Sequence, residues 1–134
     1  MKLIKCIIEL ANETKSECEI HISESSPWQL LFRPEKMEDL RIAETGLFTA
    51  SAVLRKHLEK VECKLLCNAG RENIIASRMS KQMGGGRRAY LVEFGKPALR
   101  ESLVDIFDYA DSRLVVSVEK QQSFYKKWVA SLGI

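Results

Sequence analysis

Residues 67–88 have the sequence CNAGRENIIASRMSKQMGGGRR and lie between two short apolar segments, 62–67 and 89–94, that are typical of strands. A connection of this length inside a compact domain is usually functional or carries a short helix of its own. The apolar residues in 74–76 and 79–83 are suited to such a helix, or to an anchor on the core. We call 67–88 the basic segment and expect it to hold the most distinctive surface of the chain.

The basic segment carries the whole charge excess of the protein. It contains one acid, Glu72, and five basic residues: Arg71, Arg78, Lys81, Arg87 and Arg88. Five positive charges less one negative give +4, in a chain whose formal net charge is +3. Such a local field attracts anions, phosphates or an acidic partner surface. The alternative is a solvated face that binds nothing.

The first half of the chain has the pattern of antiparallel strands. Apolar and polar residues alternate in 3–10 and in 17–22, with turn residues between them, which predicts a hairpin. A third strand is expected at 28–32, before Pro34. The mixed residues of 34–46 show no period and predict a loop.

Helical spacing begins at residue 47. In 47–61 apolar positions recur every three or four residues, with Arg55 and other charged residues opposite, which predicts a helix with Thr45 as a candidate cap. A short helix is expected within 97–107, and a C-terminal helix from 118 to near Gly133. These elements predict an α+β fold with a mostly antiparallel sheet of about five strands and two main helices packed on it, in the order β-β-β-α-β-β-α-α.

Length and composition favour one globular domain, 1–134. The chain is 46% hydrophobic and 29% charged, values typical of a folded protein. The apolar start of the chain is interrupted by Glu9 and lacks a cleavage site, and no stretch is apolar enough to span a membrane. We therefore expect a cytoplasmic protein without membrane contact.

The run Gly84-Gly85-Gly86-Arg87-Arg88 resembles a phosphate-binding loop only in part. The GxxxxGK[ST] pattern is absent, and the glycines precede a strand, whereas both phosphate-binding fingerprints precede a helix. Three glycines can still turn successive N–H groups toward an anion, which Arg87 or Arg88 would reinforce. The alternative is a flexible turn into the next strand.

Cysteine and histidine patterns argue against metal binding and nucleophilic catalysis. Cys6, Cys18, Cys63 and Cys67 form no CxxC pair, and each falls in or beside an apolar segment, so we expect reduced core thiols. His21 and His57 are expected at the surface, poorly placed to act as a base for Cys67, and nothing near Glu72 argues that it acts as a catalytic base. We therefore predict no catalytic residue, no metal ligand and no cofactor.

Two further interpretations of the basic segment concern its partners. It has the charge for RNA or phosphate contact but lacks interleaved aromatic residues, Tyr90 being the nearest. Met79 and Met83 are suited either to an adaptable protein-binding spot or to anchoring the segment on the core.

The stretch LLCNAGRENIIASRMSKQMGGGRRAYLVEFGKP, together with LVDIF and FYKKWVASL, resembles a group of small uncharacterised bacterial proteins, some of which accompany polymorphic toxin systems. The resemblance covers roughly the C-terminal half. It implies a compact binding protein similar in kind to the immunity proteins of contact-dependent growth inhibition, which block a cognate toxin domain. It implies no catalytic residues.

The sequence thus predicts a protein-binding module of immunity type, with the cognate toxin as partner. The alternatives are an anion- or nucleotide-binding protein or enzyme, and an RNA-binding protein. The predicted partner- or anion-binding residues are Asn68, Arg71, Arg78, Lys81, Gly84, Gly85, Gly86, Arg87 and Arg88. A second possible interface is the acidic first half, for example Glu35, Glu38 and Asp39.

Overall fold

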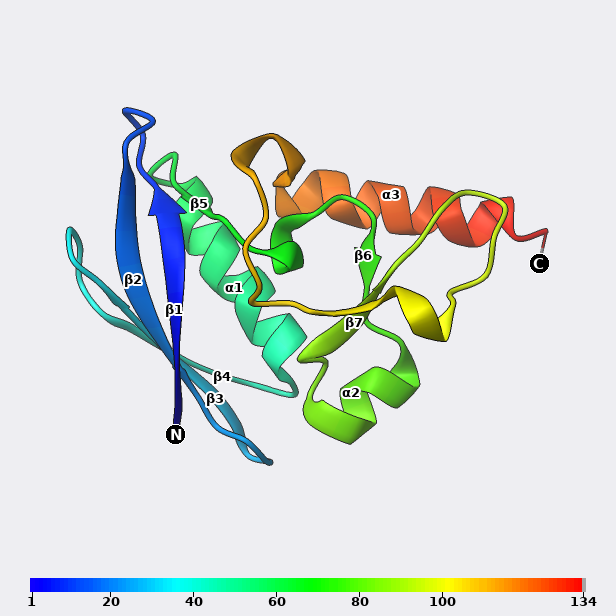
Figure 1. Cartoon of the computed structure of the whole chain (residues 1–134), viewed down its shortest axis with the longest axis horizontal. Coiled ribbons are helices and arrows are strands. Elements are labelled where there is room, and N and C mark those ends of the chain that lie inside the picture. Colours follow the sequence, from blue (N-terminus) through cyan, green and yellow to red (C-terminus); the bar gives the residue numbers. More distant parts are fainter. Residues whose placement is uncertain (134) are drawn as a thin grey trace.

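A computed structural model of the protein describes residues 1–133, apart from the side chain of Met83. It has three α-helices, a five-stranded sheet and a three-stranded sheet, so the predicted α+β class and the order of the predicted elements are confirmed. Figure 1 shows helix α1 in the middle of the molecule, between the larger sheet and the C-terminal half of the chain.

The larger sheet is antiparallel and has the strand order β4-β3-β2-β1-β5. Its strands are β1 (Lys2–Glu9), β2 (Lys15–Ile22), β3 (Trp28–Pro34), β4 (Leu40–Glu44) and β5 (Lys64–Leu65). Cys18, Ile20 and Ile22 are buried on one face of β2, as the alternation predicts. The prediction of a loop at 34–46 is wrong for part of this range, because five of its residues form strand β4. Only Ile42 of β4 is buried. One buried residue is too little to show a period of two.

Helix α1 (Leu47–Glu59) packs on β3, β4 and β5 through its buried apolar stripe. Thr45 does not cap it. The N-cap residue is Gly46, and the first two N–H groups of the helix, those of Leu47 and Phe48, donate to the carbonyl oxygen of Gly85. A distant segment therefore satisfies donors that a side chain usually satisfies.

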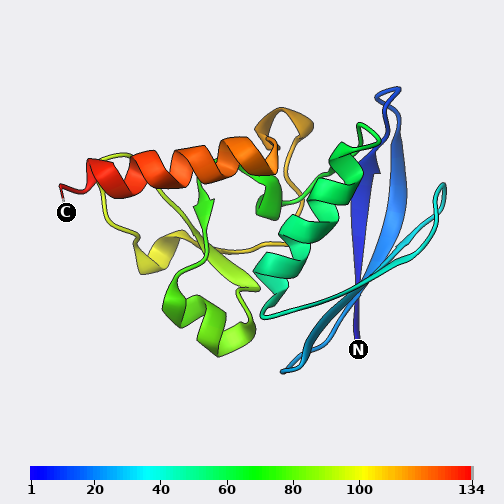
Figure 2. The same cartoon turned by 180° about the vertical axis from the view of Figure 1, so that it is seen from behind.

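The C-terminal half is built from short elements. They are η1 (Asn68–Gly70), β6 (Ile74–Ile75), α2 (Arg78–Gly84), β7 (Arg88–Leu91), η2 (Arg100–Ser102), β8 (Leu103–Asp105), η3 (Ser112–Leu114) and α3 (Val118–Ser131). Strands β6, β7 and β8 form the antiparallel three-stranded sheet. In Figures 1 and 2, α2 and α3 lie on opposite sides of β6. The short helix expected inside the basic segment is α2.

One hydrophobic cluster joins the two halves. It runs in sequence from Cys6 to Phe107 and includes residues of the larger sheet, α1, η1 and β7. A smaller cluster holds α3 through Trp128, which packs with Ile75 and Val92. Within residues 1–133, no helix combines the length and apolar character needed to cross a membrane.

Candidate functional site

The two ends of helix α2 are fixed by residues of the basic segment itself. Ser77 caps its start, because the Ser77 hydroxyl accepts the N–H of Ser80 at 3.0 Å. Its end is closed by left-handed Gly85: the Gly85 N–H donates to Lys81 and the Gly86 N–H donates to Ser80. The helix thus begins at a serine cap and ends at a glycine in the left-handed conformation.

The glycine run docks the end of α2 onto the rest of the protein. Gly85 has a φ of +64°, and a Cβ at this position would lie 2.8 Å from the indole ring of Trp28. Gly86 has a φ of +79°, and its Cβ would lie 2.8 Å from the Cβ of Phe48. The N–H groups of Gly85, Gly86 and Arg87 all donate to backbone carbonyls of α2. These three donors are therefore engaged in the turn and are not directed at a bound anion.

A large hollow lies on one side of α2, with a volume of about 780 Å³. We call it the arginine–aromatic cleft. It is lined by Glu24, Trp28, Leu47, Met79, Ser80, Gly84, Arg87, Arg88, Tyr90, Arg100 and Leu103. These residues come from α2, the α2–β7 turn, β7, β8, η2, the start of α1, and the β2–β3 connection with the start of β3. The cleft therefore combines two aromatic side chains with three arginines and one acid.

The three arginines of the cleft are not equivalent. Arg87 is half-buried and its Nη2 lies 3.2 Å from the carboxylate of Asp105. Arg88 and Arg100 are exposed and form no ion pair with any residue of 1–133. Arg87 is thus fixed by the protein, while Arg88 and Arg100 remain free to meet an external negative charge.

A second concave surface lies on the other side of α2, between α2 and α3. Two adjoining hollows of about 340 and 500 Å³ share Ile75, Ala76, Lys81 and Tyr125. The other lining residues are Phe48, Ile74, Ser77, Arg78, Gln82, Ala98, Gln121, Gln122, Lys126 and Trp128. We call this surface the α2–α3 groove. Helix α2 therefore separates two basic concave surfaces.

The nine residues predicted from sequence occupy different places. Gly84, Arg87 and Arg88 line the arginine–aromatic cleft, and Arg78 and Lys81 line the α2–α3 groove. Gly85 and Gly86 are buried in the contact with Trp28 and Phe48. Asn68 and Arg71 line neither surface. They make hydrogen bonds within the protein instead.

Asn68 is only 7% exposed, and its Nδ2 donates to the carbonyl of Asp105 at 3.1 Å. The Arg71 carbonyl accepts a hydrogen bond from the Gln121 side chain. The Arg71 Nε is a buried nitrogen without a hydrogen-bond partner among the described residues. Both residues thus connect η1 and its neighbours to β8 and α3.

Several lining residues have no signal in the sequence. Trp28 falls in a segment expected to be a strand and Tyr125 in one expected to be a helix, and nothing in the local pattern distinguishes them or Arg100 as site residues. Trp28 lies far from the glycine run along the chain, and it reaches the cleft because its indole packs against Gly85. Only the glycine run itself indicates the close approach of another segment.

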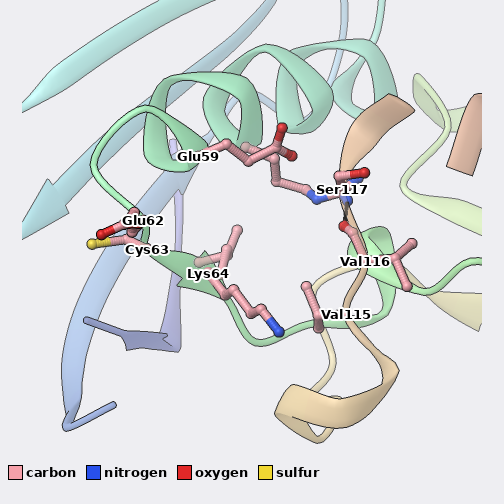
Figure 3. A pocket seen from close by; sticks show the side chains of 9 residues that line it. Glu59, Glu62, Cys63, Lys64, Val115, Val116 and Ser117 are labelled. Atoms are coloured by element: carbon pink, nitrogen blue, oxygen red, sulfur yellow. Dashed lines mark hydrogen bonds between the residues drawn. The ribbon is translucent and has the colours of Figure 1, made fainter. Parts of the chain in front are cut away.

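A third hollow, of about 270 Å³, lies beside the buried side chain of Arg55 (Figure 3). Lys64 extends toward Val115, and Glu59 lies beside Ser117 (Figure 3). The lining carries Arg55 and Lys64 against Glu59 and Glu62, so its formal charges balance. This balance gives the hollow less electrostatic attraction for a charged ligand than either surface beside α2.

Arg55 itself is a structural centre. It is 3% exposed, and burial lowers the pKa of its guanidinium. It donates to the carbonyls of Ala69 at 2.9 Å and Val116 at 2.5 Å, and to Gln121 Oε1 at 3.0 Å. The periodicity predicts Arg55 on the solvent side of its helix, which is wrong, because η1 and the start of α3 cover that side.

The described histidines and thiols form no catalytic pair near α2. His57 is exposed on α1, and His21 lies on the face of β2 opposite its buried residues, 3.4 Å from Glu19. All four cysteines are free and buried, as predicted. Burial raises the pKa of Cys67 to about 11, so the thiol beside the basic segment stays protonated at neutral pH. Among residues 1–133 no cluster of three metal-ligating side chains occurs.

The buried thiols predict a loss of stability at alkaline pH. Burial raises the pKa of Cys18 from 9.0 to about 12, and it also raises the pKa of Cys6. Because the pKa of Cys18 is raised in the folded state, the contribution of this thiol to stability is fully present below pH 9. The contribution is lost as the pH rises toward 12. Between about pH 8 and 10 the unfolding free energy should fall by about 1 kcal/mol more in the wild type than in Cys18→Ala. Urea titrations at both pH values measure this difference, and an equal fall in the two proteins would contradict it.

No protein-family model matches the chain, and a search of curated proteins finds no match either. The chemistry of the two concave surfaces beside α2 is therefore the basis for assigning a function.

Proposed function

We propose that this protein is a binding module of immunity type, which recognises a cognate bacterial toxin domain through the arginine–aromatic cleft. The observation that carries the proposal is the composition of the cleft. Trp28, Tyr90, exposed Met79 and the arginines are the residue types enriched at protein interfaces and their hot spots. A concave surface that gathers them is suited to receive a projecting part of a partner.

The free charges of the cleft define the partner further. Arg88 and Arg100 have no ion-pair partner within residues 1–133, so a carboxylate from another protein can pair with them without first displacing one. We therefore propose a toxin with an acidic or mixed surface. The immunity class itself rests on the resemblance of the C-terminal half to small bacterial proteins, some of which accompany polymorphic toxins. A cytoplasmic location is part of the same proposal.

The acidic first half is the weaker candidate for the interface. Asp39 already lies 3.3 Å from the Nε of Arg33, and Glu35 accepts a hydrogen bond from Ser16. The protein itself therefore partly neutralises Asp39 and already engages an oxygen of Glu35. A basic toxin surface would have to compete with those contacts, whereas an acidic surface meets unpaired arginines in the cleft.

Charge reversal in the cleft tests the proposal. We expect Arg88→Glu combined with Arg100→Glu to weaken binding of the cognate toxin domain by about 30-fold or more, the effect of removing a hot spot of roughly 2 kcal/mol. Isothermal titration calorimetry measures the affinity, and growth of cells that express the toxin measures protection. Both arginines are exposed, so the fold should persist.

Arg41→Glu is the matched control. Arg41 is an exposed arginine on β4, also without an ion pair in the described chain, and it does not line the cleft. Its reversal makes the same charge change as each single cleft reversal, half that of the double variant, and should leave the affinity within about twofold. Equal loss in both variants would indicate general electrostatics. The absence of any complex with a toxin domain encoded next to this protein, or of any such toxin gene, would overturn the proposed function.

A second candidate function is binding of a nucleotide or another planar anion in the same cleft. It is supported by the position of two aromatic rings and three arginines around one hollow. The engaged N–H groups of Gly85, Gly86 and Arg87 weigh against a phosphate cradle built from backbone. A thermal-shift screen with nucleotides and inorganic phosphate tests it, since a ligand that binds the folded protein raises its melting temperature. RNA binding would in addition weaken steeply with salt.

A further inference from the structure

The α2–α3 groove has an apolar floor. Ile75 and Ala76 come from β6 and the residue after it, and Tyr125 and Trp128 come from α3. The two aromatic rings lie 6.3 Å apart between centroids, and Tyr125 is 49% exposed. Figures 1 and 2 show α2 and α3 bordering this region from opposite sides. Tyr125 thus presents an aromatic face that the protein leaves half uncovered, beside the buried ring of Trp128.

Three cations surround this floor without a partner. Arg78 and Lys81 of α2 and Lys126 of α3 are exposed, and none of them forms an ion pair within residues 1–133. The lining residues described for the two hollows include no acid. Elsewhere on α3, by contrast, Lys120 lies 3.9 Å from Glu72. The groove therefore combines an apolar floor with an uncompensated charge of +3, counted from Arg78, Lys81 and Lys126.

We propose that the α2–α3 groove is a second recognition site, which takes an acidic segment of the toxin. A large apolar side chain of that segment packs on Tyr125, and flanking aspartate or glutamate side chains pair with Lys81, Arg78 and Lys126. Charge complementarity selects this occupant, because a basic or neutral segment would leave the three cations unpaired. The partner assignment rests on the proposed function. The groove is lined by different residues from the arginine–aromatic cleft, so the two sites can be separated by substitution.

The chemistry of the groove can be tested without the toxin. Anilinonaphthalene sulfonate is a fluorescent probe that joins an aromatic body to one negative charge, the two properties that the groove recognises. We expect it to bind the folded protein and to shift the amide signals of Ala76, Gln122 and Tyr125 in NMR spectra. Lys126→Glu should weaken this binding about tenfold. Lys127→Glu is the matched control, because Lys127 is exposed on the same helix and lines neither hollow.

The partner assignment is tested by displacement. The toxin domain should release the bound probe, and Lys126→Glu should weaken the toxin complex while Lys127→Glu does not. If the probe fails to bind, or binds away from the groove, the second site is overturned. If the toxin binds through the arginine–aromatic cleft but leaves the probe in place, the assignment of an acidic toxin segment to the α2–α3 groove is overturned. The proposed function then stands. If the probe binds but no toxin complex forms, the proposed function fails, and with it the assignment of the toxin as occupant.

Discussion

Replacement of Arg55 by leucine should lower the free energy of unfolding by about 3 kcal/mol or more. Arg55 makes three hydrogen bonds from a buried position, to Ala69, Val116 and Gln121. Hydrogen bonds from a charged donor contribute roughly 1.5–3 kcal/mol each, and a buried acceptor that loses its donor adds a penalty. The leucine variant no longer carries the cost of burying the guanidinium charge, which offsets part of this loss. Urea unfolding at neutral pH measures the difference.

Lys56→Leu is the control for Arg55→Leu. Lys56 is the next residue of α1, and its side chain is exposed, so the same kind of substitution should change stability by less than about 0.5 kcal/mol. The Ala69 carbonyl also accepts from Gln121 Nε2 at 2.8 Å, so it keeps one donor in the variant. If Arg55→Leu behaves like Lys56→Leu, the guanidinium does not hold α1, η1 and α3 together.

Arg55 also shows where prediction from sequence reaches its limit. Periodicity identifies the face of α1 that packs on the larger sheet, and Leu47, Ala50, Leu54 and Leu58 are buried as expected. The periodicity does not indicate that a second layer of structure packs on the other side of α1. The C-terminal half covers the opposite side of α1 through hydrogen bonds to a charged residue, a contact that leaves no apolar signal in the sequence.

The same limit applies to the candidate site. Glycine and basic residues distinguish 67–88 from the rest of the chain, and this segment does contain α2, which lies between the two concave surfaces. These features do not indicate that Arg78 and Arg88 line different surfaces, since that depends on where the chain turns after α2. The contributions of Trp28 and Tyr125 come from segments far away in sequence, and each has the spacing of an ordinary core residue.

The end of α2 makes the second strong prediction, which concerns Gly85→Ala. Its φ of +64° costs a residue with a Cβ about 1–2 kcal/mol. The new Cβ would lie 2.8 Å from the ring of Trp28, so the indole or the backbone must move, at a further cost of about 1–3 kcal/mol. We expect a total loss of about 2–5 kcal/mol in the free energy of unfolding. Urea unfolding monitored by tryptophan fluorescence and by circular dichroism measures it.

Two other glycines separate the contributions to this loss. A Cβ on Gly95 meets nothing within 4 Å although its φ is +76°, so Gly95→Ala should cost only the backbone term of about 1 kcal/mol. A Cβ on Gly84 also meets nothing within 4 Å, and Gly84 belongs to α2, so Gly84→Ala should be neutral or stabilise by up to about 1 kcal/mol. Equal stability of the Gly85 and Gly95 variants would mean that the contact with Trp28 tolerates a methyl group.

The Gly85 contact also links stability to the proposed function. The Gly85 carbonyl accepts from the N–H groups of Leu47 and Phe48, so a displaced Gly85 releases the end of α2 from α1. Because α2 borders both concave surfaces, Gly85→Ala should weaken toxin binding and probe binding together, whereas Arg88→Glu with Arg100→Glu and Lys126→Glu each affect one surface. Calorimetry on the folded fraction of each variant measures both affinities. Unchanged affinity at both surfaces would show that neither depends on how the glycine run docks α2.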